Sequence, residues 1–89
     1  MKILSGKYKR HDIKTSKKVS YRPTKTIVRK SIFDKFNVFN KKVLDLFSGT
    51  GIIGFEAMSR GASSITFVEN NRTALTLLKK NIKSFLDVD

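Results

Sequence analysis

Three glycines, Gly49, Gly51 and Gly54, follow an apolar run with the spacing G-x-G-x-x-G. Glycine allows a tight backbone turn and the close approach of a ligand. A helix-like pattern comes next, and the carboxylate of Glu69 closes the second apolar run, 20 positions after Gly49. A strand, a tight turn, a helix and a second strand with an acidic tip form the arrangement that holds a nucleoside-bearing cofactor.

Two carboxylates flank this turn. Glu69, at the tip of the second run, suits bidentate hydrogen bonding to the two hydroxyls of a ribose. Asp45 lies inside the first run, where a buried carboxylate costs several kcal/mol, on the order of 2–7, unless a partner satisfies it. Near the carboxyl end of a strand it can instead face the crevice where ligands bind in open α/β sheets. We favour this functional role over the alternative, a structural salt bridge.

The apolar runs predict an α/β fold. Residues 43–47 are almost continuously apolar, which is typical of a parallel strand buried on both faces. A helix follows and ends at Gly61, and a second strand is expected over residues 64–69. Asn70 or Asn71 would then cap another helix. The apolar positions of the two helices recur at helical spacing: Ile52, Ile53, Ala57 and Met58 in the first, and Ala74, Leu75, Leu78, Ile82 and Phe85 in the second.

The charge is concentrated in the first half of the chain. The 89 residues carry a net charge of +12. Residues 1–42 hold 14 Lys and Arg against two Asp, whereas residues 43–89 hold five of each sign and are neutral. A basic segment joined to a neutral one indicates an anionic partner, and nucleic acid is the leading candidate. A generally lysine-rich proteome is the alternative. We therefore divide the chain into a basic extension, 1–42, and a second part, 43–89.

The basic extension predicts a hairpin followed by a helix. Residues 1–22 alternate loosely and have turn points at Gly6 and near Ser16, so we expect two short strands. Thr24 is the expected N-cap of a helix over residues 24–39. We expect one apolar stripe of this helix to pack inward, so that its phenylalanines are core residues. The stripe consists of Ile27, Val28, Ile32, Phe36 and Phe39.

Two tyrosines, Tyr8 and Tyr21, lie among the basic residues of the hairpin. Lysine and arginine side chains can neutralise phosphates, and a tyrosine ring can stack on an exposed base. Packing of the rings in a small core is an equally good explanation. The sequence leaves both open.

Several classes of protein are disfavoured by what the sequence lacks. There is no cysteine, and the single histidine, His11, has no evident partners for a zinc site, so no metal is expected. No apolar run approaches the roughly 20 residues of a membrane span, and the N-terminus does not resemble a signal peptide. We expect a soluble, cytoplasmic protein without a membrane partner.

The glycine turn resembles motif I of S-adenosylmethionine-dependent methyltransferases, through the run Val-Leu-Asp-Leu-Phe-Ser-Gly-Thr-Gly at residues 43–51. Two further blocks, residues 3–9 and the Arg-Pro-Thr at 22–24 with Val28, Arg29 and Phe33, are similar to the RsmD family. Residues 57–62 also fit that family. The resemblance implies methylation of the exocyclic N2 of a guanine in 16S ribosomal RNA, with naked RNA or the small ribosomal subunit as partner.

The resemblance also implies roles for individual residues. The loop at 49–51 would wrap the methionine part of S-adenosylmethionine, Asp45 would lie near its amino group, and Glu69 would hold the ribose. The implied cofactor-binding residues are Asp45, Ser48, Gly49, Thr50, Gly51, Glu69 and Asn70. The implied RNA-binding residues are Lys7, Lys9, Arg10, Arg22 and Thr24. Thr26 and Lys30 depart from the family, which usually has acidic residues there, and this leaves the ion pairing of their helix open.

One departure concerns the reaction itself. Enzymes of this class carry an Asn/Asp-Pro-Pro-aromatic motif that holds the target amine, whereas this chain has a single proline, Pro23. No catalytic residue is therefore assigned. We expect the first two parallel strands and helices of a Rossmann-like methyltransferase fold, preceded by the basic hairpin and helix, with the catalytic half missing. The first strand would keep an open edge that could cause self-association.

Other functions remain possible on the sequence alone. The main alternative is a non-enzymatic RNA-binding remnant of such a methyltransferase, which would use only the basic extension. Half of a nicotinamide-dependent dehydrogenase is disfavoured because Asp45 to Ser48 precede the glycines, where that class is usually apolar. A DNA methyltransferase would not explain the N-terminal blocks.

Overall fold

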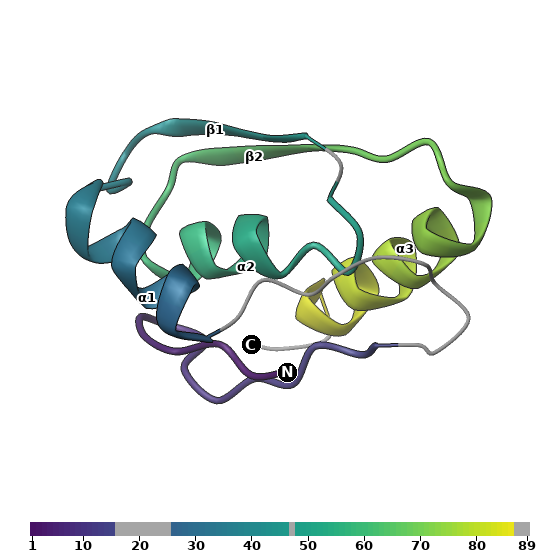
Figure 1. Ribbon diagram of the computed structural model, residues 1–89, viewed down its shortest axis with the longest axis horizontal. Helices are drawn as coiled ribbons and strands as arrows, with labels where there is room; N and C mark the ends of the chain where they lie inside the picture. Colours follow the sequence, from purple (N-terminus) through teal and green to yellow (C-terminus); the bar gives the residue numbers. More distant parts are fainter. Residues whose placement is uncertain (16–25, 47, 87–89) are drawn as a thin grey trace.

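In the part of the chain that the structure describes, the fold is a two-stranded parallel sheet with three helices. The computed structural model describes residues 1–15, 26–46 and 48–86. The elements in chain order are α1 (Thr26–Lys35), β1 (Lys42–Leu46), α2 (Ile52–Ser59), β2 (Ser64–Val68) and α3 (Arg72–Leu86). The strands pair in register from Lys42 opposite Ser64 to Leu46 opposite Val68. Figure 1 shows all three helices on one side of the strands. The predicted α/β class is confirmed.

The sheet is covered on one face within the described residues. On β1, Val43 and Asp45 face the helices, while Leu44 and Leu46 are 60% and 56% exposed. Val68 on β2 is exposed as well. The prediction that the first strand is buried on both faces is therefore wrong. Its apolar residues match a buried strand, but the helices that follow β1 and β2 both lie on the same face.

Glycines determine where α2 begins, packs and ends. Gly51 precedes the helix with a φ of 86°, in the left-handed region that favours glycine. Gly54 has no room for a side chain, because a Cβ there would overlap the ring of Phe67 on β2. Gly61 follows the helix with a φ of 98° and donates to the carbonyl of Met58. The expected stop at Gly61 is confirmed.

The N-terminal segment, residues 1–15, packs into the same core as the sheet and helices. It forms a hairpin around Gly6, with one antiparallel bridge between Lys2 and Asp12 and no longer strand in the described part. The predicted strand pair is thus reduced to a single bridge. Ile3 and Ile13 are almost fully buried. They share the central cluster with four residues of α2 and α3: Ile52, Phe55, Leu78 and Phe85.

Helix α1 is shorter than predicted and turns a different side inward. Within the described residues it runs from Thr26 to Lys35 instead of reaching residue 39. The expected inward stripe is wrong, because its residues are exposed: Ile27, Val28, Ile32, Phe36 and Phe39. The buried residues are Arg29 and Phe33. Arg29 is drawn inward by an ion pair with α2, described below, and this contact cannot be read from apolar spacing. The predicted cap Thr24 lies outside the described residues.

Helix α3 follows its predicted pattern. The Asn71 side chain accepts the Ala74 N–H at 2.9 Å, so Asn71 and not Asn70 is the cap. Ala74, Leu78 and Phe85 are buried. The basic side chains are exposed, as expected for a solvated face: Lys79, Lys80 and Lys83. Neither α3 nor another described helix is long and apolar enough to cross a membrane.

Candidate cofactor site

The glycine turn closes tightly over the start of α2. Gly49 has a φ of 57°, and the Gly51 N–H donates to the Ser48 carbonyl at 2.8 Å. A Cβ on Gly51 would lie 2.6 Å from both the Leu78 side chain and the Phe55 ring. Gly51 is thus required by its backbone angle and by lack of space. Together these contacts pack the turn tightly, so that Gly49, Thr50 and Gly51 are buried and Ser48 is half-buried.

Glu69 joins the glycine turn to the start of α3. Its Oε1 accepts the Gly49 N–H at 2.8 Å, and its Oε2 accepts the Asn71 N–H at 2.9 Å. The carboxylate is half-buried at the carboxyl ends of both strands. Each carboxylate oxygen has a second lone pair, so two hydroxyl donors could still bind. The residues present therefore fit a ribose.

Asp45 lies behind the turn, under α2. It is 9% exposed, and its Oδ2 accepts the Gly54 N–H at 3.1 Å. Burial raises the pKa of Asp45; the Gly54 hydrogen bond opposes this shift, and the nearby charge of Glu69 adds to it. No ion pair to Asp45 occurs among the described residues. A cation brought by a ligand would therefore be favourable beside it.

Ser48 and Asn70 differ in how they are placed. The Ser48 hydroxyl donates to the Asp45 carbonyl at 2.7 Å and accepts the Val68 N–H at 3.2 Å. It thus ties the ends of β1 and β2 together. Asn70 is exposed beside Glu69. All seven predicted cofactor residues lie at the carboxyl-terminal side of the two strands. They belong to the end of β1, the glycine turn that follows it, and the residues directly after β2.

Asn81, which the sequence analysis missed, connects this site to the N-terminal segment. It is fully buried on α3, where its Nδ2 donates to the Thr50 carbonyl at 3.0 Å. The same amide bonds both backbone groups of Lys14, at 2.9 and 3.1 Å. The available signal was a polar residue between Leu78 and Phe85 on the apolar face of the helix.

Glu56, also missed, holds the other end of the N-terminal segment. It is fully buried on α2, and its two oxygens accept the N–H groups of Leu4 and Ser5 at 2.8 and 3.1 Å. It pairs with Arg60 at 2.9 Å and with Arg29 at 3.5 Å. Burial lowers the pKa of Arg29, and the charge of Glu56 opposes that shift. The sequence feature that could have indicated this role is that Glu56 is the single carboxylate in an otherwise mostly apolar helix.

Ser59 completes this attachment. Its hydroxyl donates to the Ser5 carbonyl at 2.6 Å and accepts the Tyr8 N–H at 2.9 Å. A side chain on Gly6 would collide with the Ser59 backbone. We call Glu56, Ser59 and Asn81 the N-terminal anchor, because all three bond the backbone of residues 4–14.

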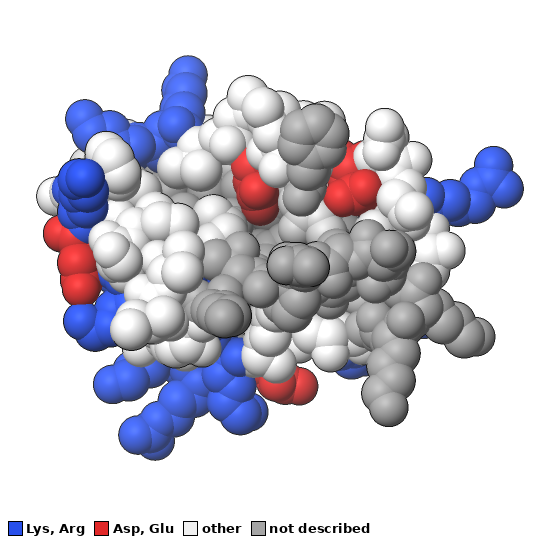
Figure 2. Space-filling model, viewed as in Figure 1, with Lys and Arg blue, Asp and Glu red and all other residues white. Residues whose placement is uncertain are grey.

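The predicted RNA-binding residues are only partly described. Lys7, Lys9 and Arg10 are exposed on the turn after Gly6, and Figure 2 shows basic side chains projecting from the part of the molecule that carries α1 and this segment. Arg22 and Thr24 lie outside the described residues, as does Tyr21. The Tyr8 ring packs edge-on against Phe85 at 5.1 Å, which favours packing over base stacking for this tyrosine.

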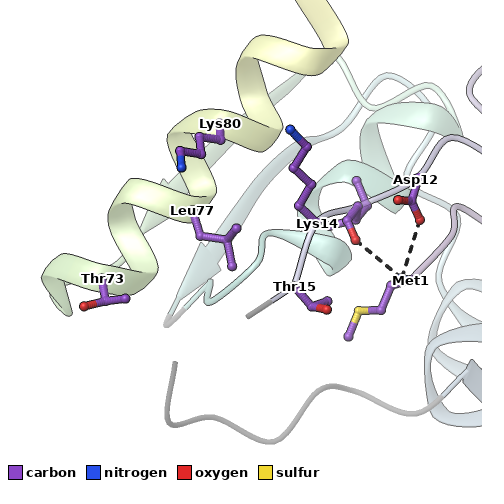
Figure 3. Close-up of a pocket in the computed structure, with 8 residues that line it drawn as sticks. Met1, Asp12, Lys14, Thr15, Thr73, Leu77 and Lys80 are labelled. Carbon is purple, nitrogen blue, oxygen red and sulfur yellow. Dashed lines mark hydrogen bonds and ion pairs between the residues drawn. The ribbon is translucent and has the colours of Figure 1, made fainter. Parts of the chain in front are cut away.

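A separate hollow lies between the N-terminal segment and α3. Its volume is about 550 Å³. Figure 3 shows Thr73, Leu77 and Lys80 on one wall and Met1, Asp12, Lys14 and Thr15 on the other. None of the predicted cofactor residues lines it, so it is separate from the candidate cofactor site. No cluster of three metal-ligating side chains occurs in the part of the chain that the structure describes.

A family model and two curated relatives indicate the same family for this chain. The family model Conserved hypothetical protein 95 matches residues 1–88. Ribosomal RNA small subunit methyltransferase D of Buchnera aphidicola from Baizongia pistaciae is 39% identical over 85 residues, which cover 90% of this chain and 42% of that protein. The Haemophilus influenzae protein of the same name is 31% identical over 86 residues, covering 94% and 45%.

Solved structures agree with this result. The Escherichia coli protein yhhF, assigned as a methyltransferase, matches with a TM-score of 0.83 and 27% identity over 98% of this chain and 48% of its own. A hypothetical protein of Thermus thermophilus matches with a TM-score of 0.80 and 34% identity, over 93% and 48%. The chain thus spans about half the length of these relatives and matches the N-terminal part of a Rossmann-like methyltransferase fold. It belongs to the Conserved hypothetical protein 95 family, which is the RsmD family of methyltransferases.

Proposed function

We propose that this chain is the cofactor-binding part of an S-adenosylmethionine-dependent methyltransferase that acts on the exocyclic N2 of a guanine in 16S ribosomal RNA. The observation that carries the proposal is the contact between Glu69 and Gly49, at 2.8 Å. It brings the carboxylate of the second strand to the glycine turn, as a nucleoside-bearing cofactor requires. The names of the relatives support ribosomal RNA of the small subunit as the substrate.

Within this proposal the cofactor lies across the carboxyl ends of β1 and β2. Glu69 accepts hydrogen bonds from the two ribose hydroxyls, and Asn70 lies next to it. The turn of Ser48 to Gly51 surrounds the methionine part. Asp45 faces the amino group, whose positive charge favours the ionised carboxylate. Affinity should therefore fall at low pH, where Asp45 becomes protonated.

The basic N-terminal segment supplies the RNA-facing surface in the same proposal. Lys7, Lys9 and Arg10 contact phosphates, and Arg22 and Thr24 continue this surface. The N-terminal anchor supports the assignment, since it attaches the segment to the helices that flank the cofactor site. The place of action would be the cytoplasm, on naked RNA or on the small ribosomal subunit.

The methyl transfer itself requires more than these 89 residues. The cofactor supplies the methyl group, and the enzyme mainly holds the amine in line with it. The Asn/Asp-Pro-Pro-aromatic motif that would hold the amine has no counterpart in this sequence. We therefore expect the isolated chain to bind S-adenosylmethionine weakly and to transfer no methyl group.

A second candidate function is RNA binding without catalysis. It is favoured by the net charge of +12, all of which resides in residues 1–42. Such a protein would bind RNA with an affinity that falls steeply with salt and does not change when S-adenosylmethionine is added.

The proposed activity can be tested by joining this chain to the part of the Buchnera relative that it does not match. The joined protein is incubated with S-adenosylmethionine and 16S ribosomal RNA or small subunits, and N2-methylguanosine is measured by mass spectrometry. We expect methylation in the joined protein, a large loss in its Glu69→Gln variant, and little change in Asp34→Asn, which alters an exposed carboxylate of α1. Methylation that survives Glu69→Gln unchanged would contradict the proposed site.

A further inference from the structure

Helix α3 is a basic helix inside the half of the chain whose net charge is zero. It carries four exposed basic side chains and no carboxylate: Arg72, Lys79, Lys80 and Lys83. The described carboxylates of the same half instead accept backbone N–H groups inside the fold: Asp45, Glu56 and Glu69. None of the four cations forms an ion pair within residues 1–15, 26–46 and 48–86. α3 therefore presents unbalanced positive charge to solvent.

Part of this charge borders the hollow of about 550 Å³ between α3 and the N-terminal segment. Lys80 and Thr73 lie on the α3 wall, and Figure 3 shows Lys14 and Thr15 on the opposite wall. Ammonium and hydroxyl groups are the usual donors to the phosphates of a nucleic acid. The half-buried Leu77 adds an apolar contact on the α3 wall. Because ligand sites span roughly 300–1,000 Å³, the hollow has both the room and the donors for a nucleotide-sized anion.

The carboxylate that lines the hollow, Asp12, does not cancel its positive charge. Asp12 is paired with two cations, the Met1 amino group at 3.7 Å and the Lys2 Nζ at 3.8 Å. Neither Lys14 nor Lys80 has an ion-pair partner among the described residues. The lining residues contribute two lysines and the Met1 amino group against one carboxylate, a net charge of +2. The hollow therefore favours an anion.

The hollow adjoins the candidate cofactor site on two sides. Both backbone groups of Lys14 are held by the buried Asn81, whose Nδ2 also donates to the Thr50 carbonyl of the glycine turn. On the other wall, Thr73 lies in the first turn of α3, which begins shortly after Glu69. A ligand in the hollow would therefore lie next to the cofactor site.

We propose that this hollow binds the sugar–phosphate backbone of the substrate RNA, and that α3 extends the RNA-binding surface beyond residues 1–42. Lys14 and Lys80 bind phosphate oxygens from the two walls. The threonine hydroxyls donate to the same backbone, and Leu77 packs against a ribose. This inference rests on the proposed function for RNA as the ligand. Its test measures binding without S-adenosylmethionine, so its failure can be separated from a failure of the methylation activity.

The test titrates the complete 89-residue chain into a fluorescently labelled fragment of 16S ribosomal RNA and measures anisotropy at several salt concentrations. Lys14→Gln combined with Lys80→Gln should weaken binding by about 10-fold and reduce the slope of log affinity against log salt concentration by about 1–2. The matched control combines Lys41→Gln with Lys42→Gln, which removes two exposed lysines at the amino-terminal end of β1. It should leave the affinity within about threefold. All four lysines are exposed, so both variants should fold, which circular dichroism checks.

A third variant, Lys7→Gln with Lys9→Gln, separates the hollow from the RNA-facing turn already proposed, and it should weaken binding as well. Weakening by this variant alone would overturn the inference and leave the proposed RNA surface standing. Equal weakening by the hollow variant and its matched control would also overturn the inference, since total charge alone would then explain binding. An absence of RNA binding by the parent chain would contradict both proposals. RNA binding that depends on the hollow, without methylation by the joined protein, would support this site and contradict the proposed activity.

Discussion

Buried polar groups occur in two regions of this molecule and are satisfied to different degrees. In the N-terminal anchor, Glu56 has four partners and Asn81 bonds three backbone groups. In the candidate cofactor site, Asp45 has one backbone hydrogen bond and a raised pKa. A buried carboxylate with several partners stabilises one structure, whereas a buried carboxylate with a single hydrogen bond and a raised pKa is typical of a binding site. The anchor therefore serves stability, and the candidate cofactor site is suited to binding.

The largest expected effect comes from the anchor. Glu56→Gln removes the charge that faces Arg29 and Arg60, and it leaves the buried guanidinium of Arg29 and the partly exposed one of Arg60 without a counter-ion. We expect the free energy of unfolding to fall by about 3–5 kcal/mol, the usual cost of breaking a buried pair. Urea unfolding measures it. Asp34→Asn, which breaks the exposed pair with Lys30, should cost less than about 1 kcal/mol. Equal decreases in the free energy of unfolding of the two variants would contradict the claim that the buried ion pair stabilises the chain more than the exposed one.

A smaller loss is expected at the second anchor residue. Asn81→Ala leaves the Thr50 carbonyl and both Lys14 backbone groups without their partner. The unfolding free energy should fall by about 1–3 kcal/mol. Thr76→Ala, on the exposed side of the same helix, should stay within about 0.5 kcal/mol of the parent. Hydrogen exchange at the Lys14 amide should accelerate in Asn81→Ala alone, and an unchanged rate there would contradict the assigned role.

The N-terminal anchor also shows which contacts could not be predicted from the sequence. The glycine turn, β2, the Asn71 cap region and the apolar face of α3 were predictable because local spacing and backbone demands specify them. Arg29 and Glu56 come from different helices and meet only in the folded chain. That meeting rotates α1 so that Ile27 and Phe36 are exposed, which apolar spacing alone could not anticipate.

The exposure of Leu44 and Leu46, on the face of the sheet opposite the helices, was not predicted, for another reason. The composition of residues 43–47 correctly indicates a strand suited to burial, but burial depends on what lies over it. The described helices cover only one face, so Leu44 and Leu46 remain exposed. In the candidate site, the glycine motif and the family resemblance were sufficient to name seven residues that the structure brings together at the carboxyl ends of β1 and β2. The actual partners of Ser48 and Glu69 required the structure.

The stability contributed by Asp45 in the candidate cofactor site should depend on pH. Because the pKa of Asp45 is raised in the folded chain, the folded state holds this proton more tightly than the unfolded state does. The free energy of unfolding should therefore decrease as pH rises from about 3.9, the ordinary pKa of aspartate, through the raised value. Asp45→Asn removes this contribution. Urea unfolding of both proteins at several pH values measures the difference, and a difference that stays constant with pH would refute the assignment.

The most direct test of the central claim is a titration of the 89-residue chain with S-adenosylmethionine, followed by nuclear magnetic resonance of its backbone amides. Weak binding should shift the amides of Gly49, Gly51 and Asn71, with little change in the N-terminal anchor. Glu69→Gln should greatly weaken these shifts, since it replaces one of the two acceptor oxygens by an amide donor and removes the carboxylate charge. Shifts that persist in Glu69→Gln, or that gather around the hollow beside Lys80 instead, would contradict the proposed cofactor site.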